Sequence, residues 1–361
     1  MKYLYAPLIL LLLASCAEEK KETPKPEHSA TDWAFYKLNG DVQSVSEKSL
    51  KLTAGPSITG SEIATAHDTD LYFDENGNLI SEKQWAGGTN PFEEKAYNGR
   101  EKLLRRTQYI AGKPGIVTEN LWNDADKTLS SETRRNPDNT QIDRITYTYK
   151  DGRLAEKLKV NAQNNALERY TYIYDKKGNL IQDAIYKGTE ILQSQGRYKY
   201  DANGNKIFES RLNDGKAIYT TRYQYDGKNL VKQETSDAAD KAEYTEIFTH
   251  DATGNVTKHV TIEHAQNLKT EESITYDKSN RIATRITEKA GQPAVKVLYA
   301  YDENGNLTAT KTADSEGKTL DDRKYTFEYD THKNWVKKKV AVNGQPAFEV
   351  TRTITYHEDK K

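Results

Sequence analysis

The sequence is poor in several residue types, and each shortage narrows the kinds of protein it can encode. Its 361 residues include one cysteine, Cys16, so no disulfide can form within the chain. The net charge of −1 provides no basic surface for phosphates and gives no reason to expect a nucleic-acid partner. Hydrophobic residues make up 35% of the chain, too few for a thick core covered on both sides.

Tyrosine, by contrast, is abundant. The chain has 24 Tyr, too many for a disordered protein. They often occupy alternate positions, as in Tyr170, Tyr172 and Tyr174, or Tyr147 and Tyr149. Period-two alternation of aromatic and β-branched residues is typical of a strand with one buried face. Composition and pattern together predict an amphipathic sheet with a tyrosine-rich face.

The tyrosine runs end in a short motif that recurs along the chain. Residues 301–307 read YDENGNL, and residues 73–79, 174–180 and 200–206 are near-copies. The Asp suits the first position of a type I turn, because its carboxylate can accept hydrogen bonds from backbone N–H groups just ahead. The Gly can then enter the left-handed conformation. We therefore predict that each copy is the tip of a β-hairpin.

Copies of this turn follow one another at a spacing of about 25 residues, which indicates an array of one supersecondary unit. With the Asp position as marker, they fall at Asp74, Asn98, Asn123, Lys150, Asp175, Asp201, Asp226, Asp251, Asp277, Asp302, Asp330 and His357. Each period holds a second, more variable turn signal near its middle, as at residues 112–115, 213–216, 290–293 and 343–346.

The repeats predict an all-β fold, an antiparallel meander of about 12 two-stranded repeats with no helix beyond the leader. Residues 33–71 look like an atypical opening unit. A flat sheet of about 24 strands would be about 115 Å long, and twisted open sheets rarely pass about ten strands without curling. We expect the sheet to coil into a spiral or barrel-like wrap with its tyrosines inward. A flat single-layer sheet is the competing shape.

Residues 1–15 have the features of a signal peptide. The apolar run at residues 8–13 is too short to span a bilayer comfortably. Residues 13–16 read LASC, which resembles the lipobox of bacterial lipoproteins. By that resemblance Cys16 receives diacylglycerol and becomes the first residue after cleavage. An ordinary secretory signal and an uncleaved membrane helix are the alternatives.

Residues 16–30 read as an acylated Cys followed by a disordered tether. The tether has a charged cluster at residues 18–22 and two prolines, with almost nothing to bury. Ala17 rather than Asp behind the Cys agrees with delivery to the outer membrane, and the acidic cluster resembles the surface-export signal of Bacteroidetes lipoproteins. We expect an anchor in outer-membrane lipid through Cys16 with the protein facing outward; a periplasmic orientation stays open.

The recurring motif resembles the YD repeat of the Rhs and teneurin families over residues 31–361, which we treat as a single β domain. The resemblance implies a hollow β shell, in bacteria often built around a C-terminal toxin. The sequence ends inside a repeat, and the core-terminating motif of Rhs proteins is not evident in it. A lipobox followed by these repeats is most similar to the short YD-repeat lipoproteins of Bacteroidetes.

Two groups of residues invite a metal-binding interpretation. Asp302, Asn304 and Asn306 share the opening spacing of a calcium loop, but the glycine comes too early and turn chemistry explains all three. The only histidine cluster is His250, His259 and His264. A zinc site requires ligands that converge, and the spacings of these three residues indicate no shared face. We predict no catalytic residues, no metal site and no cofactor.

Three tryptophans could stack on sugars, but packing is the better interpretation. Trp122 occupies the Tyr position of its repeat, Trp335 occupies the Leu position, and Trp85 aligns with large apolar residues of other copies.

The sequence therefore favours a non-enzymatic, lipid-anchored surface protein that acts as a scaffold or binding surface. We expect a polysaccharide or protein ligand at the variable mid-repeat loops, because binding usually resides on variable turns of a rigid frame. The alternative is a shell component of a toxin or contact-dependent competition system.

Overall fold

The computed structural model describes residues 30–52, 67–86, 90–123, 125 and 127–358. The predicted leader, Cys16 and nearly all of the predicted tether lie outside the described residues. The described residues contain one short helix, α1 (Asp32–Phe35), and 24 strands.

The strands follow one another along the chain, and apart from residues 52–66 between β1 and β2 their connections have two to five residues. The first twelve are β1 (Val42–Lys51), β2 (His67–Phe73), β3 (Leu79–Ala86), β4 (Asn90–Tyr97), β5 (Leu103–Ile110), β6 (Lys113–Asn123), β7 (Thr128–Arg135), β8 (Gln141–Lys150), β9 (Arg153–Asn161), β10 (Ala166–Tyr174), β11 (Leu180–Lys187) and β12 (Ile191–Tyr200). The others are β13 (Lys206–Asn213), β14 (Lys216–Asp226), β15 (Asn229–Asp237), β16 (Ala242–His250), β17 (Val256–Glu263), β18 (Leu268–Tyr276), β19 (Ile282–Lys289), β20 (Val295–Tyr301), β21 (Leu307–Asp314), β22 (Thr319–Tyr329), β23 (Trp335–Val342) and β24 (Gln345–Tyr356).

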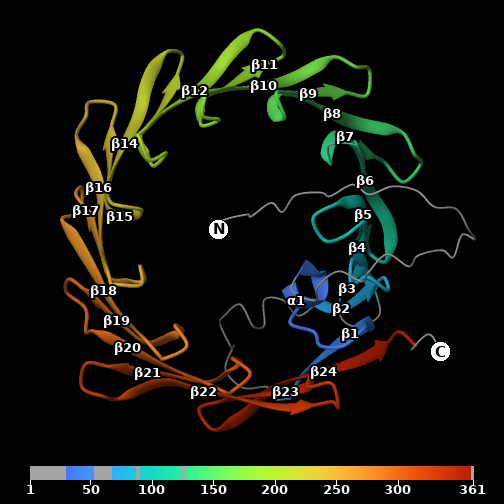
Figure 1. Cartoon of the computed structure of the whole chain (residues 1–361), viewed down its shortest axis with the longest axis vertical. Coiled ribbons are helices and arrows are strands. Elements are labelled where there is room, and N and C mark those ends of the chain that lie inside the picture. Colours follow the sequence, from blue (N-terminus) through green and yellow to red (C-terminus); the bar gives the residue numbers. More distant parts are fainter. Residues whose placement is uncertain (1–29, 53–66, 87–89, 124, 126, 359–361) are drawn as a thin grey trace, which may run out of the picture.

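The sheet is a closed ring. Each strand pairs antiparallel with the next one in the sequence, and β24 pairs with β1 from Val42 to Lys51. Figure 1 looks along the axis of this ring, with β1 and β24 side by side where the blue and red ends of the chain meet. The predicted all-β antiparallel meander is confirmed, and of the shapes considered it adopts the barrel-like one rather than an open spiral or a flat sheet.

The predicted hairpin tips all lie at one end of the ring, after the even-numbered strands. In the turn that begins at Asp201, the amide of Gly204 donates to the carbonyl of Asp201 at 3.2 Å, and Gly204 has a φ of +86°. The Asp201 carboxylate accepts hydrogen bonds from the amides of Asn203 and Asn205 at 2.9 and 2.8 Å. In the equivalent turn, hydrogen bonds from Thr253 and Asn255 lower the pKa of Asp251 to about 2.

The mid-repeat turns lie at the opposite end of the ring. Several contain only two residues, both with positive φ, as in Asp214–Gly215 (+47° and +74°) and Asn343–Gly344 (+51° and +78°). Such turns match the twist of a hairpin. They are shorter than the predicted tracts, because the third and fourth residues of 112–115 and 343–346 already belong to the next strands.

Helix α1 contradicts the prediction that no helix follows the leader. The hydroxyl of Thr31 accepts a hydrogen bond from the amide of Ala34, and the buried Trp33 holds the helix against the sheet. A helix of four residues is too short to show helical periodicity in the sequence and is stabilised by this packing.

The position of α1 identifies the inner face of the sheet. Figure 1 shows α1 inside the ring, and Trp33 packs there in one cluster with Val45, while Leu71 and Ile354 border that cluster. Directly opposed residues share a face. The row of opposed residues that starts at Leu71 continues through Glu82, Lys95, Arg106, Thr118 and Arg134 to Asp143. Ile145, Tyr147 and Tyr149 follow Asp143 at every second position of the same strand and therefore share its face. The tyrosine row therefore faces the interior, as predicted.

Replacing Gly204 with Val tests the turn geometry. No side chain approaches Gly204 within 4 Å, so the substitution strains only the backbone. We expect Gly204→Val to lower the free energy of unfolding by about 1–3 kcal/mol in denaturant titrations. Ala202→Val, in the same turn but outside the left-handed region, is the control. Equal denaturation midpoints for the two variants would contradict the assignment.

Candidate functional site

The tyrosine of the repeat motif joins neighbouring hairpins. In four copies its hydroxyl donates a hydrogen bond to a backbone carbonyl at the start of the second strand of the preceding hairpin, whereas Tyr97, Tyr329 and Tyr356 donate to carboxylates. The pairs are Tyr149 to Leu129 (3.1 Å), Tyr200 to Leu180 (2.9 Å), Tyr276 to Val256 (2.9 Å) and Tyr301 to Ile282 (3.1 Å). Trp122 makes the same contact, with its indole Nε1 2.7 Å from the carbonyl of Leu103. These residues are structural, which agrees with placing Trp122 in the tyrosine position.

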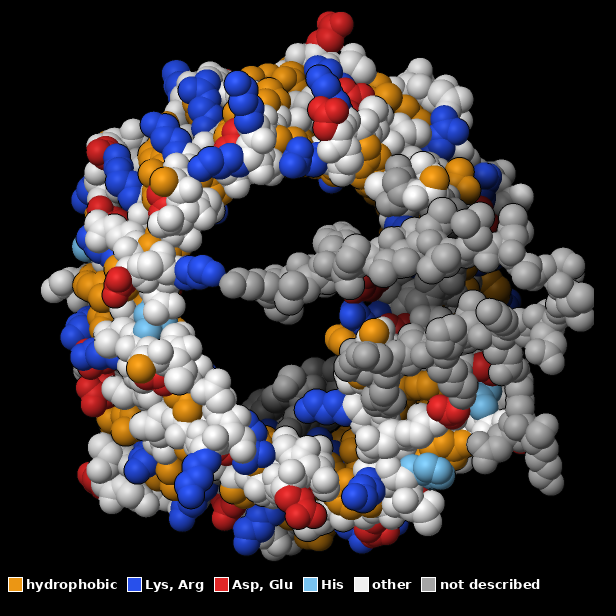
Figure 2. All heavy atoms as spheres, viewed as in Figure 1, with side chains coloured by type: hydrophobic (Ala, Val, Ile, Leu, Met, Phe, Trp, Pro, Cys, Tyr) orange, Lys and Arg blue, Asp and Glu red, His pale blue; other side chains and the backbone are white. Residues whose placement is uncertain are grey.

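Farther along the wall, the inner face carries hydrogen-bonded ion pairs. Asp183 accepts a bond from the hydroxyl of Tyr198 at 2.5 Å and from Arg211 at 2.8 Å. Burial and the bond to Asp183 raise the pKa of Tyr198 above its usual value. Gly196 leaves room for this group, since a Cβ there would clash with the Asp183 carboxylate. This part of the wall therefore carries hydrogen-bonded polar groups, and the described residues leave the centre of the ring open (Figure 2).

The segment around α1 fastens the seam of the ring from inside. On one side, Asp32 Oδ2 accepts hydrogen bonds from the amides of Leu79 (2.6 Å) and Arg100 (2.8 Å). On the other side, Asn39 and Asn334 are linked twice, amide to Oδ1 at 2.7 Å and Nδ2 to carbonyl at 2.8 Å. The segment thereby spans from the hairpin tips beside β3 and β5 to the tip that precedes β23.

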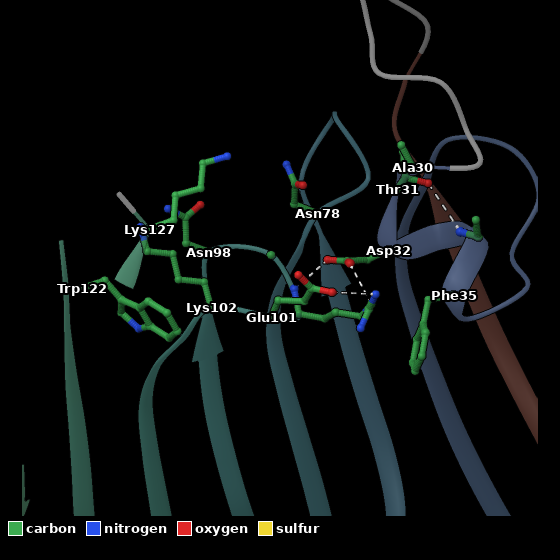
Figure 3. Close-up of a pocket in the computed structure, with 13 residues that line it drawn as sticks. Ala30, Thr31, Asp32, Phe35, Asn78, Asn98, Glu101, Lys102, Trp122 and Lys127 are labelled. Carbon is green, nitrogen blue, oxygen red and sulfur yellow. Dashed lines mark hydrogen bonds and ion pairs between the residues drawn. The ribbon is translucent and has the colours of Figure 1, made fainter. Parts of the chain in front are cut away.

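One cavity lies between α1 and the hairpin tips that follow β4 and β6. Its volume is about 1020 Å³, and its lining includes Phe35, Arg100, Lys102, Trp122 and Lys127. Figure 3 shows Trp122 on one side and Phe35 on the other, with Asp32 and Glu101 between them. The guanidinium of Arg100 lies 4.3 Å from the Phe35 ring centroid and 3.3 Å from the Asp32 carboxylate, so its charge is paired at the edge of this cavity.

A second cavity, of about 940 Å³, lies on the other side of α1, against β20–β24. Its lining combines aromatic rings and cations on the inner face: Tyr301, Tyr325, Phe327, Tyr329, Trp335, Lys338 and Arg352, with Lys37 and Lys333 near α1. We call this the seam cavity. Arg352 stacks 3.5 Å from the Trp335 centroid and pairs with Glu47 at 2.9 Å. Burial lowers the pKa of Arg352, and Glu47 opposes that shift.

The residues considered for metal binding are used by the fold. Asp302 accepts hydrogen bonds from the Asn306 amide at 2.8 Å and from the Tyr329 hydroxyl at 2.9 Å. His259 lies 3.0 Å from Glu246, whereas His264 bonds the hydroxyl of Thr245. Thr245 and Glu246 are adjacent in a strand and point to opposite faces, so the structure keeps these two histidines apart.

Within the described ranges, no group of three or more His, Cys, Asp or Glu side chains could hold a metal ion. In the same residues, no helix is long and apolar enough to cross a membrane.

The other tryptophans divide between packing and exposure. Trp335 packs against a buried cluster that includes Tyr325 and Phe348, as predicted. Trp85 donates a hydrogen bond to Asp70 at 2.7 Å, and Lys83 lies 4.4 Å from its ring centroid on the outer face. It is half-buried, so packing accounts for only part of its surface.

Sequence reasoning missed Phe35, Lys338 and Arg352 as lining residues. Phe35 has one sequence signal, the departure of the opening unit from the repeat, whereas Lys338 and Arg352 look like ordinary strand residues. The cavities form where α1 lies against the inner face, and no second helix does so among the described residues.

Comparison with protein-family models found no match, and no curated protein matches the chain. Several solved structures resemble it. A Tc holotoxin pore structure from Photorhabdus luminescens has 14% identity and a TM-score of 0.44, covering 76% of this chain and 17% of that one. The TcdB2–TccC3–TEV structure has 11% identity and a TM-score of 0.39, covering 79% of this chain and 19% of that one.

A porin-like protein from Bacteroides uniformis has 9% identity and a TM-score of 0.26, covering 88% of this chain and 99% of that one. The chain thus spans less than a fifth of the first two structures. At these scores the similarities carry no argument about function.

The hydrogen-bonding role of Trp122 can be tested with two replacements of equal size. We expect Trp122→Tyr to unfold at higher denaturant than Trp122→Phe, because only Tyr can donate to the carbonyl of Leu103. The difference should be about 1 kcal/mol in the free energy of unfolding. Coincident unfolding curves would show that the donor at this position contributes nothing.

Proposed function

We propose that this is a non-enzymatic, lipid-anchored binding protein of the outer membrane, whose ligand docks on the inner face of the ring. The observation that carries the proposal is the pair of cavities flanking α1. They combine aromatic rings with charged groups on an otherwise regular wall. Concave sites with a few convergent polar groups are the usual form of a ligand site.

The site differs from the one expected from the sequence. The mid-repeat turns were the expected location, but both cavities lie beside the Asp-containing hairpin tips at the other end of the ring. The proposed ligand is still a polysaccharide or a protein, and its proposed binding site is the pair of cavities rather than the mid-repeat turns.

The repeat class and the anchor belong to the same proposal. The tyrosine–carbonyl bonds between hairpins give the recurring motif a role in assembling a ring, which supports a YD-repeat assignment. The lipobox-like residues 13–16 support lipidation of Cys16. A ring tethered this way would stand at the membrane surface with its interior accessible to ligands.

A second candidate, a shell component of a toxin or competition system, is favoured by one observation. The described residues enclose an open centre rather than a solid tyrosine core (Figure 2). This candidate predicts a polypeptide that co-purifies with the ring and resists protease until the ring is unfolded. Rapid digestion of any co-purifying polypeptide would remove it.

The binding role can be tested on arrays of glycans and surface-extract fractions, with the detergent-solubilised full chain as probe. We expect a discrete set of positive ligands whose binding is lost when Phe35, which is 60% exposed and lines both cavities, is replaced by Asp. Ile191→Asp, at an exposed position remote from α1, is the control. Uniform silence on both arrays would contradict the binding role.

The anchor makes a separate prediction. We expect Cys16→Ser to abolish metabolic labelling with radioactive fatty acid and to move the protein from the membrane fraction to the soluble fraction, because the thioether-linked lipid provides most of the membrane affinity. Continued sedimentation with membranes after this change would contradict the lipid anchor. Protease shaving of intact cells then distinguishes the outward orientation from the periplasmic one.

A further inference from the structure

The seam cavity is positively charged where it meets solvent. Among the described residues that line it, Lys37, Lys333, Lys338 and Arg352 are cationic, and no Asp or Glu contributes to the lining. Glu47, the cross-strand partner of Arg352, pairs with it at 2.9 Å, so the remaining cations of the lining are Lys37, Lys333 and Lys338. Lys37, beside α1, and Lys333, in the hairpin tip before β23, are both exposed, and their segments meet where Asn39 Nδ2 donates to the carbonyl of Lys333 at 3.4 Å. A ligand that reaches this junction would meet both positive charges.

The floor of the cavity is a set of aromatic rings held at fixed angles. Phe327 and Trp335 are 6.2 Å apart at an interplanar angle of 65°, and Phe327 and Tyr329 are also 6.2 Å apart. Tyr325 is buried below them, with the Lys338 ammonium 5.2 Å from its ring centroid. Rings fixed in this way offer stacking surfaces without losing side-chain entropy on binding.

Polar groups complete the lining. Asn304 and Asn306 belong to the hairpin tip after β20, and the Asn306 amide already donates to the Tyr329 hydroxyl at 2.8 Å. Ring faces, amide groups and ammonium groups in one concavity fit a ligand that has flat apolar faces, hydroxyls and negative charge. A sugar acid has all three.

The topology argues against an extended peptide. Peptides commonly bind by adding a strand to an exposed sheet edge. The described sheet offers no such edge, because β24 pairs with β1 and every other strand is paired on both sides. A peptide in the seam cavity would lack the backbone hydrogen bonds that give this mode its affinity.

We propose that the seam cavity binds an anionic oligosaccharide built from carboxylated sugars, with Lys338, Lys333 and Lys37 contacting the carboxylates and Phe327, Tyr329 and Trp335 contacting the sugar rings. This inference rests on the proposed binding function and deepens it by assigning the ligand class and the residues. It makes charge, rather than shape alone, the basis of selection.

The test is calorimetric titration of the full chain with a short oligogalacturonide, a neutral cello-oligosaccharide of equal length and an oligoglutamate of similar charge. We expect the oligogalacturonide to bind at least about tenfold more tightly than either of the others. Its affinity should fall as salt rises from about 0.05 to about 0.5 M, because added ions screen the lysines.

Two matched substitutions locate the site. Lys338→Met keeps the aliphatic stem over Tyr325 and removes the charge, and we expect it to weaken oligogalacturonide binding about tenfold. Lys324→Met removes an exposed lysine from the outer face of the adjacent strand and should leave binding unchanged. Thermal melting of both variants confirms that each is folded.

The outcomes separate this inference from the broader one. Equal affinity for the neutral and acidic sugars would overturn charge selection and leave a glycan-binding function in place. Tighter binding of oligoglutamate would overturn the sugar assignment in favour of an acidic protein. Equal effects of Lys338→Met and Lys324→Met on oligogalacturonide affinity would overturn the seam cavity as the site, and so would the absence of binding of any probe. The arrays of glycans and surface extracts decide independently whether the protein binds ligands at all.

Discussion

The structure depends on closing a single-layer sheet. A sheet that has no second layer across it cannot rely on a thick core, and any free edge would leave a row of backbone N–H and C=O groups unpaired. The pairing of β24 with β1 removes that edge, and it does so between the two ends of the folded chain. The bonds from Tyr149, Tyr200 and their equivalents to carbonyls of the preceding hairpin add a second set of links around the ring.

Closure also explains why the irregular part of the chain matters. A ring of similar hairpins has a uniform inner face. Helix α1 interrupts it at the seam, where Trp33 packs beside β1 and β2, and Asn39 reaches Asn334 beside β23. The segment that fastens the seam also lines a cavity on each of its two sides. The two cavities are therefore consequences of how the ring is closed.

Much of the frame could be predicted from single repeats. The Asp and Gly of each tip specify a local turn, since the carboxylate bonds its own backbone and the glycine alone accepts positive φ at little cost. Trp122 could be assigned to the tyrosine position from spacing alone, and its indole makes the tyrosine contact. Helix α1 could not be predicted, because four residues are too few to show helical periodicity. The helix is stabilised instead by packing of Trp33 against Val42, which lies beyond the next turn, and against Phe73, which is distant in the sequence. Lys338, Phe327 and Arg352 gave no functional signal, because each looks like an ordinary strand residue until α1 covers part of their face.

By itself the sequence determined the local and periodic properties of this protein: antiparallel strands, their order, the turns that join them and a tyrosine face directed to one side. These follow from interactions within a hairpin or between adjacent hairpins, which every repeat encodes. Only the tertiary structure decided that the meander closes, which strands meet, and where the inner face is shaped into cavities. Those outcomes depend on the twist summed over 24 strands and on contacts such as Asn39 with Asn334, 295 residues apart, which no single repeat contains.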